Sequence, residues 1–586
     1  MRGVDASGHG QPTAGDARPA AGHRVPPGPA GRAGRAAWID VSVAAVPAAL
    51  GLATGGYHAG VPPLWRDEAA TKAIAGRPVR QILATMPHDD VVHGAYYLVV
   101  HVVIRLIGSS GGALRLPSVL AMAVACAFTA LIAQRLCRAA GPLPAACAGM
   151  TAGLVFALLP ATIRYAQEAR SYAIVTMMAT VATYLLLRAI GDGRRRWWAA
   201  YGAAAFLTGL FNVFGLLLLV AHALTLLITA ERGPGRRPLR VPLGWLVACL
   251  AAVALVLPIL FMAYGQRDAL NWMSSSAPFR ADVVALTHLW AGSPGLAWPV
   301  FGLAALGAVL SMALGPTLGP TLGAPLGPAP GAATENPGEN RGWRRDLTPG
   351  TVALPWLLAP PVVLLAVSVS HPVYDQRYVE FCLPALAICV ASGITWLWRL
   401  AAAVLGRPAG GRGTRGPIGP GRPALAWLAP LPAVAVAVAL AVALQPADSV
   451  VRQPGYRPDN LESEARIIAA NARPGDIVFY IPLNDRIVSM PFPGPWRTLR
   501  DIALARSPVS SDTLYGTDVT PAGLLKRFTH VSRVWVVTSS EVSEAAYLAT
   551  PEATPLDKAE ARLIGAMREI RSWRDGDTEL TLYAAR

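Results

Sequence analysis

The chain has 586 residues, of which 53% are hydrophobic and only 15% are charged, and its mean hydropathy is +0.41. So few charged residues exclude an ordinary soluble multidomain protein. A net charge of +16 would indicate nucleic-acid binding in a soluble chain, but among this many apolar segments it indicates basic loops on the cytoplasmic side of a membrane.

The N-terminal residues 1–37 are rich in Gly, Pro, Ala and Arg and predict a disordered cytoplasmic tail. They lack the charged-then-apolar layout of a cleavable signal peptide. From residue 39 to residue 445, apolar runs near the ~20 residues that cross a bilayer recur. The sequence therefore predicts a polytopic α-helical protein of the plasma membrane.

Basic clusters decide which loops face the cytoplasm. These clusters are QRLCR (134–138), GDGRRRWW (191–198), ERGPGRRPLR (231–240), RGWRR (341–345) and the Gly/Arg/Pro stretch 406–422. Joining them predicts a transmembrane domain over 38–445 with about 11 helices, a cytoplasmic N-terminus and an extracytoplasmic C-terminal domain. The crossings are expected near 39–57, 115–135, 143–163, 173–190, two short legs in 199–229, 243–263, 293–314, 351–369, 379–399 and 425–445.

Three segments inside this domain depart from simple crossings. The run YYLVVHVVIRLIG (96–108) is short for a span and carries two polar side chains, so we expect a helix in the interface, within a first outer loop over 58–114. Residues 199–229 lie between two basic loops and must go out and back, turning near FNVFG (211–215). Residues 315–340 form a repetitive cytoplasmic linker.

The last part of the chain, residues 446–586, is soluble in character, with 17 Lys and Arg against 18 Asp and Glu. Strand patterns occur at 476–482, 531–539 and 578–585, and amphipathic helix patterns at 460–472 and 555–570. They predict a small extracytoplasmic α/β domain that covers the outer site or grips an acceptor. Residues 446–586 contain no G-x-G-x-x-G and no P-loop, and no CxxC metal motif occurs anywhere in the chain.

The predicted topology brings polar loops to one outer face. They are the loop with Asp67 and Glu68, RYAQEARSY (164–172), YGQRDALNWM (264–273) and HPVYDQRY (371–378). We expect acids and arginines from these four loops to converge there. The acids in these outer regions are Asp67, Glu68, Asp89, Asp90, Glu168, Asp268, Asp282, Asp375 and Glu380.

Asp67 and Glu68 are adjacent, so on a helix their side chains diverge by about 100° and cannot both reach one atom. One of them is expected to be the working carboxylate, and the other to hold Arg66, Lys72 or a loop backbone. The structural alternative is an acid pair at a helix N-terminus, favoured by the helix dipole after an interfacial Trp65.

The stretch PHDDVVHGAYYL (87–98) offers Asp89, Asp90 and His93. Two carboxylates and one histidine are a weak signal for a divalent cation, so no cofactor is firmly indicated. The same side chains are suited to binding sugar hydroxyls, and Asp90 to capping the interfacial helix.

Arginines on the outer loops have two interpretations. A guanidinium stays charged and binds phosphate bidentately, which suits Arg170 and Arg377. Arginines at helix ends also reach lipid headgroups without any specific role. His222, alone in an apolar run, is predicted to be a core histidine with satisfied hydrogen bonds.

Several of these stretches resemble one family. W-R-D-E-A (65–69), D-x-x-H (90–93), Y-Y-L-x-x-H (96–101), L-R-L-P-S (114–118), Q-E-A-R-S-Y (167–172) and Q-R-Y (376–378) are similar to the GT-C membrane glycosyltransferases. The likeness is to the protein-mannosyltransferase and aminoarabinose-transferase group, in its actinobacterial form. It is specific over about 57–175, looser to 400 and absent from the C-terminal domain.

The resemblance implies a GT-C-like helical bundle whose first outer loop carries the active site, and a polyprenyl-phosphate sugar donor at the outer leaflet. It places the family's acidic pair on Asp67 and Glu68 and phosphate-binding arginines on Arg170 and Arg377. Family members commonly have prolines after the histidine, whereas this chain has His93, Gly94 and Ala95, which puts the interfacial turn and the acceptor in doubt.

The sequence thus predicts a glycosyltransferase that moves mannose or a related sugar to an acceptor hydroxyl by inverting single displacement, with Asp67 or Glu68 as general base. Expected partners are the lipid-linked donor, membrane lipids and a glycan, lipid or protein acceptor, with no nucleic acid. The predicted substrate-binding residues are Asp89, Asp90, His93, Tyr96, Arg164, Gln167, Glu168, Arg170, Tyr172, Arg377 and Tyr378.

Two other functions are open to the sequence. A transporter or flippase for a lipid-linked cell-envelope intermediate would use charges near the bilayer midplane, and the predicted spans contain almost none. A sensory or assembly scaffold would explain the C-terminal domain but not the polar outer loops.

Overall fold

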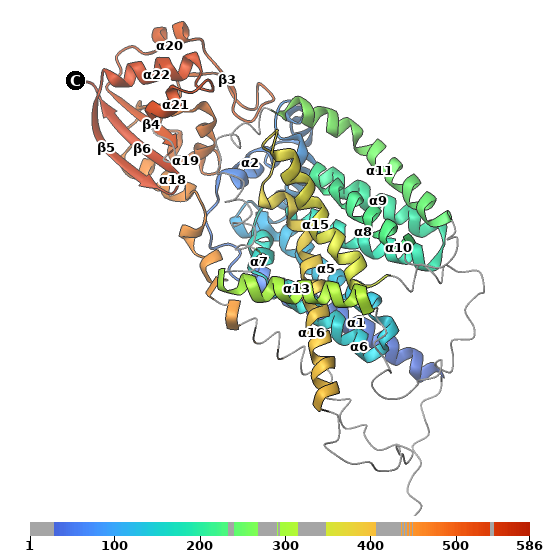
Figure 1. Cartoon of the computed structure of the whole chain (residues 1–586). Coiled ribbons are helices and arrows are strands. Elements are labelled where there is room, and N and C mark those ends of the chain that lie inside the picture. The colour runs from blue at the N-terminus through green and yellow to red at the C-terminus, as the bar shows by residue number, and fades with distance from the viewer. Residues whose placement is uncertain are drawn as a thin grey trace, which may run out of the picture.

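A computed structural model describes residues 29–231, 239–267, 294–314, 347–405, 449–539 and 544–586, and the single positions 290, 435, 439, 442–444, 446 and 447. Helices dominate the part up to residue 405, and a mixed sheet lies in the C-terminal part (Figure 1). The predicted tail 1–37 lies mostly, and the linker 315–340 entirely, outside the described residues, as do Asp268 and Asp282.

The helices of the first part follow one another closely along the chain. In order they are α1 (Pro29–Gly56), α2 (Arg66–Ala75), α3 (Val79–Thr85), η1 (Val91–His93), α4 (Gly94–Ile107), α5 (Gly111–Leu136), η2 (Arg138–Ala140), α6 (Pro142–Leu158), α7 (Pro160–Ala166), α8 (Tyr172–Asp192), α9 (Arg195–Phe211), η3 (Val213–Leu216), α10 (Leu217–Glu231), α11 (Arg240–Gly265), α13 (Pro294–Leu314), α15 (Pro349–Ser368), η6 (Gln376–Cys382) and α16 (Leu383–Leu405).

Eight helical segments among the described residues are long and apolar enough to cross a membrane. The bent pair α6 and α7, with 63° between them, would be a ninth. Each predicted crossing up to residue 399 coincides with a helix, so the multi-pass helical class is confirmed. Most of the expected crossing 425–445 lies outside the described residues, and the count of eleven stays a prediction.

The predicted out-and-back segment 199–229 is two helices, α9 with 17 residues and the stretch Val213–Ala230 with 18. They are separated at Asn212, whose side chain accepts a hydrogen bond from the backbone N–H of Phe214. The turn therefore falls where FNVFG predicted it. His222 lies in α10 and bonds Thr183 and Tyr201 at 3.1 and 3.0 Å. This confirms the predicted core histidine with satisfied hydrogen bonds.

The helix α4 matches the predicted interfacial segment. Its 14 residues would span only about 21 Å, which is too short to cross the ~30 Å hydrocarbon core. Tyr96, Tyr97 and Val100 are buried on its inner side, while Val102 and Leu106 are 54% and 76% exposed. An apolar exposed face of this kind suits a helix that lies against lipid, and its place in the interface stays a prediction.

The bend between α6 and α7 positions the loop 167–171. Pro160 has no backbone N–H, so it favours the end of one helix and the first turn of the next. The short α7 that follows delivers residues 167–171 to the end of the bundle where α2 lies (Figure 1).

Close packing of α6 against α1 and α5 depends on small residues. A Cβ added at Gly153 would lie 2.6 Å from Pro47, and one at Gly149 would lie 2.7 Å from the carbonyl oxygen of Ala130. Small residues of this kind allow membrane helices to approach closely, where lipid supplies no hydrophobic drive for association.

We predict that Gly153→Leu destabilises the bundle by about 1–3 kcal/mol, because the added side chain forces α6 away from α1. Thermal unfolding in detergent measures it. Gly302→Ala in α13, where an added Cβ meets nothing within 4 Å, is the matched control and should leave the melting temperature unchanged or slightly raised. Equal melting temperatures for Gly153→Leu and the wild type would contradict the packing described here.

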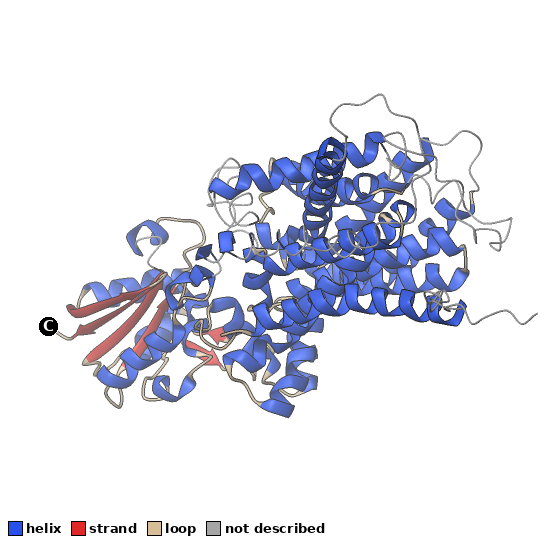
Figure 2. Ribbon diagram, turned by 90° about the horizontal axis from the view of Figure 1, so that it is seen from below, coloured by secondary structure: helices blue, strands red, loops and turns tan. Residues whose placement is uncertain are grey.

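The C-terminal part contains a four-stranded sheet of order β1-β4-β6-β5. Strands β1 and β4 are parallel, and the other two pairs are antiparallel. Figure 2 shows the sheet at one end of the molecule beside the helical bundle. The elements are α18 (Leu461–Asn471), β1 (Ile477–Ile481), η9 (Leu483–Ser489), α19 (Pro493–Trp496), β2 (Leu504–Arg506), β3 (Thr517–Asp518), α20 (Pro521–Arg527), β4 (Arg533–Ser539), α21 (Glu544–Leu548), α22 (Pro555–Gly565), β5 (Arg568–Asp575) and β6 (Thr578–Ala584).

The three expected strands are β1, β4 and β6, and the expected helices begin where predicted. The sequence pattern missed the short pair β2 and β3. It also missed the fourth strand of the larger sheet, β5, because the second helix was predicted over 555–570 and α22 ends at Gly565. Residues from Arg568 onward form β5 and return through Gly576, at φ +61°, to pair with β6. Glycine suits this left-handed position in a tight hairpin turn. The domain boundary at 446 and the extracytoplasmic location stay predictions.

Candidate functional site

A buried ion pair joins the first turn of α2 to α5. The carboxylate of Glu68 accepts from Nε and Nη2 of Arg115 at 2.7 and 2.6 Å, and both side chains are fully buried. Glu68 also accepts from the backbone N–H of Ala169 at 2.8 Å. Arg115 donates further to the carbonyls of Ala59, Pro62 and Pro63. Glu68 therefore holds a loop backbone, as expected for one member of the acid pair, but its cation is Arg115 rather than Arg66 or Lys72.

The neighbouring Asp67 points elsewhere. Its Oδ2 accepts from Nη1 of Arg377 at 2.7 Å and lies 3.7 Å from Nε of Arg170. The Asp67 side chain is 26% exposed, in contrast to the fully buried Glu68. Asp67 is thus an accessible carboxylate set between two arginines that come from distant parts of the sequence.

Arg170 lies at the centre of a second set of contacts. Its Nη1 donates to Asp90 at 3.0 Å and to the hydroxyl of Tyr97 at 3.1 Å, and Tyr97 donates to the same carboxylate. Burial alone would raise the pKa of Asp90, but Arg170, His93 and the Tyr97 hydroxyl outweigh it and lower this pKa to about 2. Asp90 is therefore anionic and keeps Arg170 in place.

Arg377 is held by its own loop. Asp375 accepts from the backbone N–H of Arg377 at 3.0 Å and from its Nε at 2.9 Å. The guanidinium carbon lies 5.8 Å from the ring centre of Trp65, which precedes α2. These contacts leave the outer edge of the guanidinium directed at Asp67.

Aromatic rings form a wall beside these charges. The ring of Tyr378 stacks on Phe214 at 4.6 Å and lies 6.4 Å from Tyr172, and the ring of His93 meets Tyr172 edge-on at 5.6 Å. His93 bonds Ser171 at 2.8 Å. Burial, with Arg170 adding to it, lowers the pKa of His93 to about 4, so this imidazole is neutral. Flat rings next to cations suit binding of a sugar ring.

The side chains of Glu168 and Arg164 are more buried than that of Asp67. Arg164 pairs with Glu168, and the guanidinium of Arg457 approaches the same carboxylate at 3.6 Å. Burial raises the pKa of Glu168 to about 7, and Glu68 and Asp67 add to this rise while Arg164 opposes it. Neither carboxyl oxygen of the nearby buried Glu380 has a hydrogen-bond partner among the described residues.

Two predicted substrate-binding residues use their side chains in hydrogen bonds within the protein. Gln167 is fully buried and donates to the carbonyls of Gly55 and Tyr57 at 3.0 and 2.7 Å. Tyr96 is also fully buried and bonds Ser118 at 3.1 Å. Gln167 thus joins the loop 167–171 to the end of α1, and Tyr96 joins α4 to α5.

The three side chains considered for a divalent cation point in different directions. Asp89 accepts from the backbone N–H of Leu514, Asp90 binds Arg170, and His93 binds Ser171. No group of three or more His, Cys, Asp or Glu within the described ranges is arranged to hold a metal ion. Asp90 precedes η1 at φ 52° but makes no side-chain capping bond, so the expectation that it caps the interfacial helix was wrong.

The loop that begins at Tyr264 contributes through Gln266. Its side chain accepts from the backbone N–H of Val91 at 3.0 Å and donates to the carbonyl of Met86 at 2.7 Å. It therefore fixes the loop that carries Asp89 and Asp90. Acids and arginines from the first loop, from 164–172 and from 371–378 meet, as the sequence predicted, whereas 264–273 contributes an amide and its Asp268 lies outside the described residues.

The C-terminal part closes one side of this region. Leu514 bonds Asp89 at 2.7 Å, and Nη2 of Arg77 donates to the carbonyl of Thr513 at 2.9 Å. Burial, followed by Asp90, Asp89 and Asp67, raises the pKa of Tyr515. The segment 513–515 thus lies over the acidic edge of the site; the sequence predicted that this domain could cover the site but not which segment would do so.

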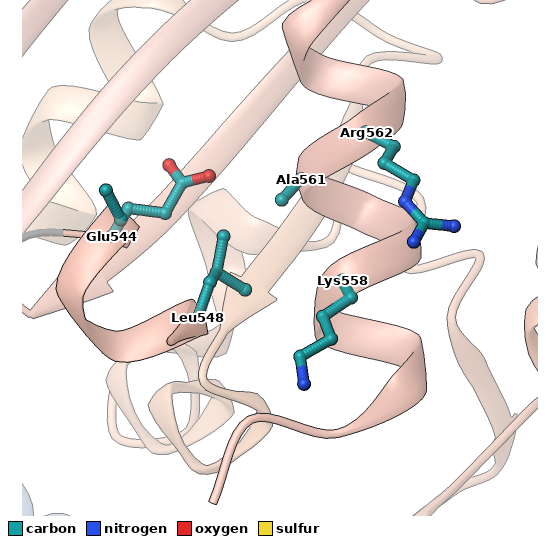
Figure 3. A pocket seen from close by; sticks show the side chains of 6 residues that line it. Glu544, Leu548, Lys558, Ala561 and Arg562 are labelled. Atoms are coloured by element: carbon teal, nitrogen blue, oxygen red, sulfur yellow. The ribbon is translucent and has the colours of Figure 1, made fainter. Parts of the chain in front are cut away.

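A separate open pocket of about 540 Å³ lies between α21 and α22 (Figure 3). Leu548 and Ala561 line it together with the charged Glu544, Lys558 and Arg562. It belongs to the C-terminal domain and takes no part in the Asp67 site.

Sequence reasoning missed Arg115 and Tyr97, and it named Asp375 among the outer acids without pairing it with Arg377. Arg115 stands in the L-R-L-P-S stretch that carries the family resemblance, so a buried charge within a predicted crossing was the available signal. Tyr97 was hidden beside Tyr96, because the turn of α4 that decides which tyrosine faces Arg170 depends on packing.

Comparisons with known proteins agree with this picture. Residues 95–262 match the model of the family described as dolichyl-phosphate-mannose-protein mannosyltransferase. This family match confirms the resemblance to GT-C glycosyltransferases that the sequence motifs predicted. No curated protein matches the chain in sequence.

Solved structures with a similar arrangement share little sequence. ArnT from Cupriavidus metallidurans bound to undecaprenyl phosphate is 16% identical, with 94% of this chain and 98% of that chain covered and a TM-score of 0.48. The same protein in the apo state gives a TM-score of 0.49 at the same identity and coverage. The oligosaccharyltransferase AglB from Archaeoglobus fulgidus, in complex with an inhibitory peptide and a dolichol-phosphate, is 11% identical, with 94% and 74% covered and a TM-score of 0.42.

We predict that Glu68→Gln or Arg115→Met costs about 3–5 kcal/mol of stability, because each leaves a buried charge unpaired. The double variant Glu68→Gln/Arg115→Met should cost less than the sum of the two single changes. Thermal unfolding of the four proteins in detergent gives the coupling. Additive losses would contradict a direct pair.

Glu168 makes a pH-dependent contribution. Its pKa is raised in the folded protein, so its stabilising effect is present at low pH and is lost as pH rises from about 4.5 to about 7. The melting temperature of the wild type minus that of Glu168→Gln should fall across this window and stay constant above it. A difference that is flat or rises there would contradict the buried position of Glu168.

Proposed function

We propose that the protein is a membrane glycosyltransferase that transfers a sugar from a polyprenyl-phosphate donor to an acceptor hydroxyl at the outer face of the membrane. The observation that carries the proposal is the position of Asp67. It is an accessible carboxylate between Arg170 and Arg377, at a junction of loops beside aromatic rings. The family match over residues 95–262 supports the same class of reaction.

The residues can divide the reaction between them. Asp67 takes the proton of the acceptor hydroxyl as its oxygen forms a bond to the anomeric carbon. The bond from that carbon to the phosphate oxygen breaks, and its electron pair stays on the phosphate. Arg170 and Arg377 stabilise the added negative charge. One carboxylate base suffices, because a phosphate leaving group needs no protonation, and inversion at the anomeric carbon follows.

The roles of the acid pair are separated by burial. Glu68 is fully buried and bound by Arg115 and Ala169, so it cannot reach an acceptor. Asp67 is the member left for catalysis. Mannose or a related sugar is the expected group, and a glycan, lipid or protein the expected acceptor.

Asp67 accepts from Nη1 of Arg377, a nitrogen that a bound phosphate would also use. A bound phosphate takes over donors of Arg377 and Arg170 and releases the carboxylate of Asp67 to act as a base. Donor binding and base activation are therefore coupled through the same guanidinium groups.

The coupling gives a prediction for undecaprenyl phosphate binding to the purified protein. Arg377→Gln and Arg170→Gln should weaken binding at least ~10-fold, because each removes a charged donor. Asp67→Asn should bind at least as tightly as the wild type, since it removes a competing anion, and should lose transfer by ~100-fold or more. Equilibrium binding and mass spectrometry of cell-envelope glycans from complemented deletion strains are the measurements.

Arg80→Gln, which changes an exposed arginine of α3, is the matched control and should bind and transfer normally. Full transfer by Asp67→Asn would remove Asp67 from the mechanism. Wild-type binding by both arginine variants would place the phosphate elsewhere.

A further inference from the structure

The residue before Asp67 is bound by the C-terminal domain. Arg66 opens α2, and its Nε donates to Asp459 at 3.1 Å and its Nη2 to the hydroxyl of Thr578 at 3.1 Å, while its Nη1 pairs with Asp485. The partners come from three separate segments of the domain. Their attachment therefore depends on the folded domain and not on one flexible stretch of chain.

Asp459 also takes the place of a side-chain N-cap on α2. The N-cap residue of α2 is Trp65, which makes no side-chain capping bond. The first N–H groups of a helix have no partner within the helix, and an acid near them is stabilising. Asp459 accepts from the backbone N–H of Arg66 at 3.2 Å, so an aspartate 393 positions away fills this role.

Burial makes these contacts strong. The side chains of Asp459 and Asp485 are each 2% exposed, so either acid without Arg66 would be a buried, uncompensated charge. Arg66 in turn is fixed by both acids and by Thr578. The first turn of α2 has little freedom, and Asp67 is its second residue.

The contacts of Arg66 do not hold the two arginines of the site. Arg170 lies on the loop before α8 and Arg377 on η6, and both are held by acids of the transmembrane part. Loss of the Arg66 contacts would therefore displace Asp67 while the two arginines keep their places.

We propose that Arg66 is a positioning residue through which the C-terminal domain aligns the Asp67 carboxylate with the reacting hydroxyl, so that this domain is part of the catalytic apparatus. The inference rests on the proposed function of Asp67. It assigns the domain a role in the chemical step in addition to covering the site or binding an acceptor.

The test compares two properties of the full-length protein. A misplacement of about 1 Å at a reacting group can cost ~100-fold in rate. Arg66→Met should therefore lower transfer ~10- to 100-fold, read from envelope glycans in a complemented deletion strain. Its affinity for undecaprenyl phosphate should stay within about twofold of the wild type. Arg66→Lys keeps the charge and should recover part of the transfer.

Arg452→Met is the matched control. Arg452 also joins the C-terminal part to the helical bundle, because its Nη2 donates to the carbonyl of Thr54 at 3.0 Å, but this contact is made with α1 and not with α2. Transfer should be retained in this variant. If Arg452→Met lost as much transfer as Arg66→Met, general docking of the domain would be the cause and the positioning role would be refuted.

The outcomes separate the two proposals. If the wild type neither binds undecaprenyl phosphate nor changes the envelope glycans, the proposed function fails. If the wild type does both and Arg66→Met matches it, the positioning role fails alone. If Arg66→Met loses phosphate binding as well as transfer, Arg66 supports the whole site and the specific alignment of Asp67 is contradicted.

Discussion

The fully buried pair between Glu68 and Arg115 is the constraint on which the site depends. Two ionised groups without water are stable only when every donor and acceptor is matched. Here the matching partners are the carbonyls of the turn before α2 and the backbone of Ala169. Satisfying one guanidinium therefore fixes that turn, α2, α5 and the loop 167–171 relative to one another.

This constraint explains how adjacent acids come to have different tasks. Once Glu68 points inward to Arg115, the ~100° step of the helix directs Asp67 to another side. There it meets Arg170 and Arg377, which are themselves held by Asp90 and Asp375. Within one helical turn, Glu68 is thus a structural acid and Asp67 the proposed reactive acid. The C-terminal domain further restrains the start of this helix through Arg66.

Much of this arrangement could be predicted from the sequence. Apolar runs and basic clusters predicted the crossings, because the length of a membrane span and the charge of its flanking loops can be recognised from the local amino-acid composition. The same topology placed Asp67, Arg170 and Arg377 on one side, and the motifs around them indicated the family resemblance. What could not be predicted were pairings set by packing: Arg115 with Glu68, Tyr97 in place of Tyr96, and Arg66 with Asp459. Partners hundreds of residues apart leave no local pattern, and the strand β5 was missed because its residues continue a helical periodicity.

The central claim is that one aspartate and a donor phosphate compete for the same guanidinium groups. An experimental structure of the protein with undecaprenyl phosphate tests it most directly. The account predicts the phosphate within hydrogen-bond distance of Arg170 and Arg377, with Oδ2 of Asp67 moved off Arg377 and Glu68 still on Arg115. A phosphate bound away from these arginines, with the contact between Asp67 and Arg377 intact, would contradict it.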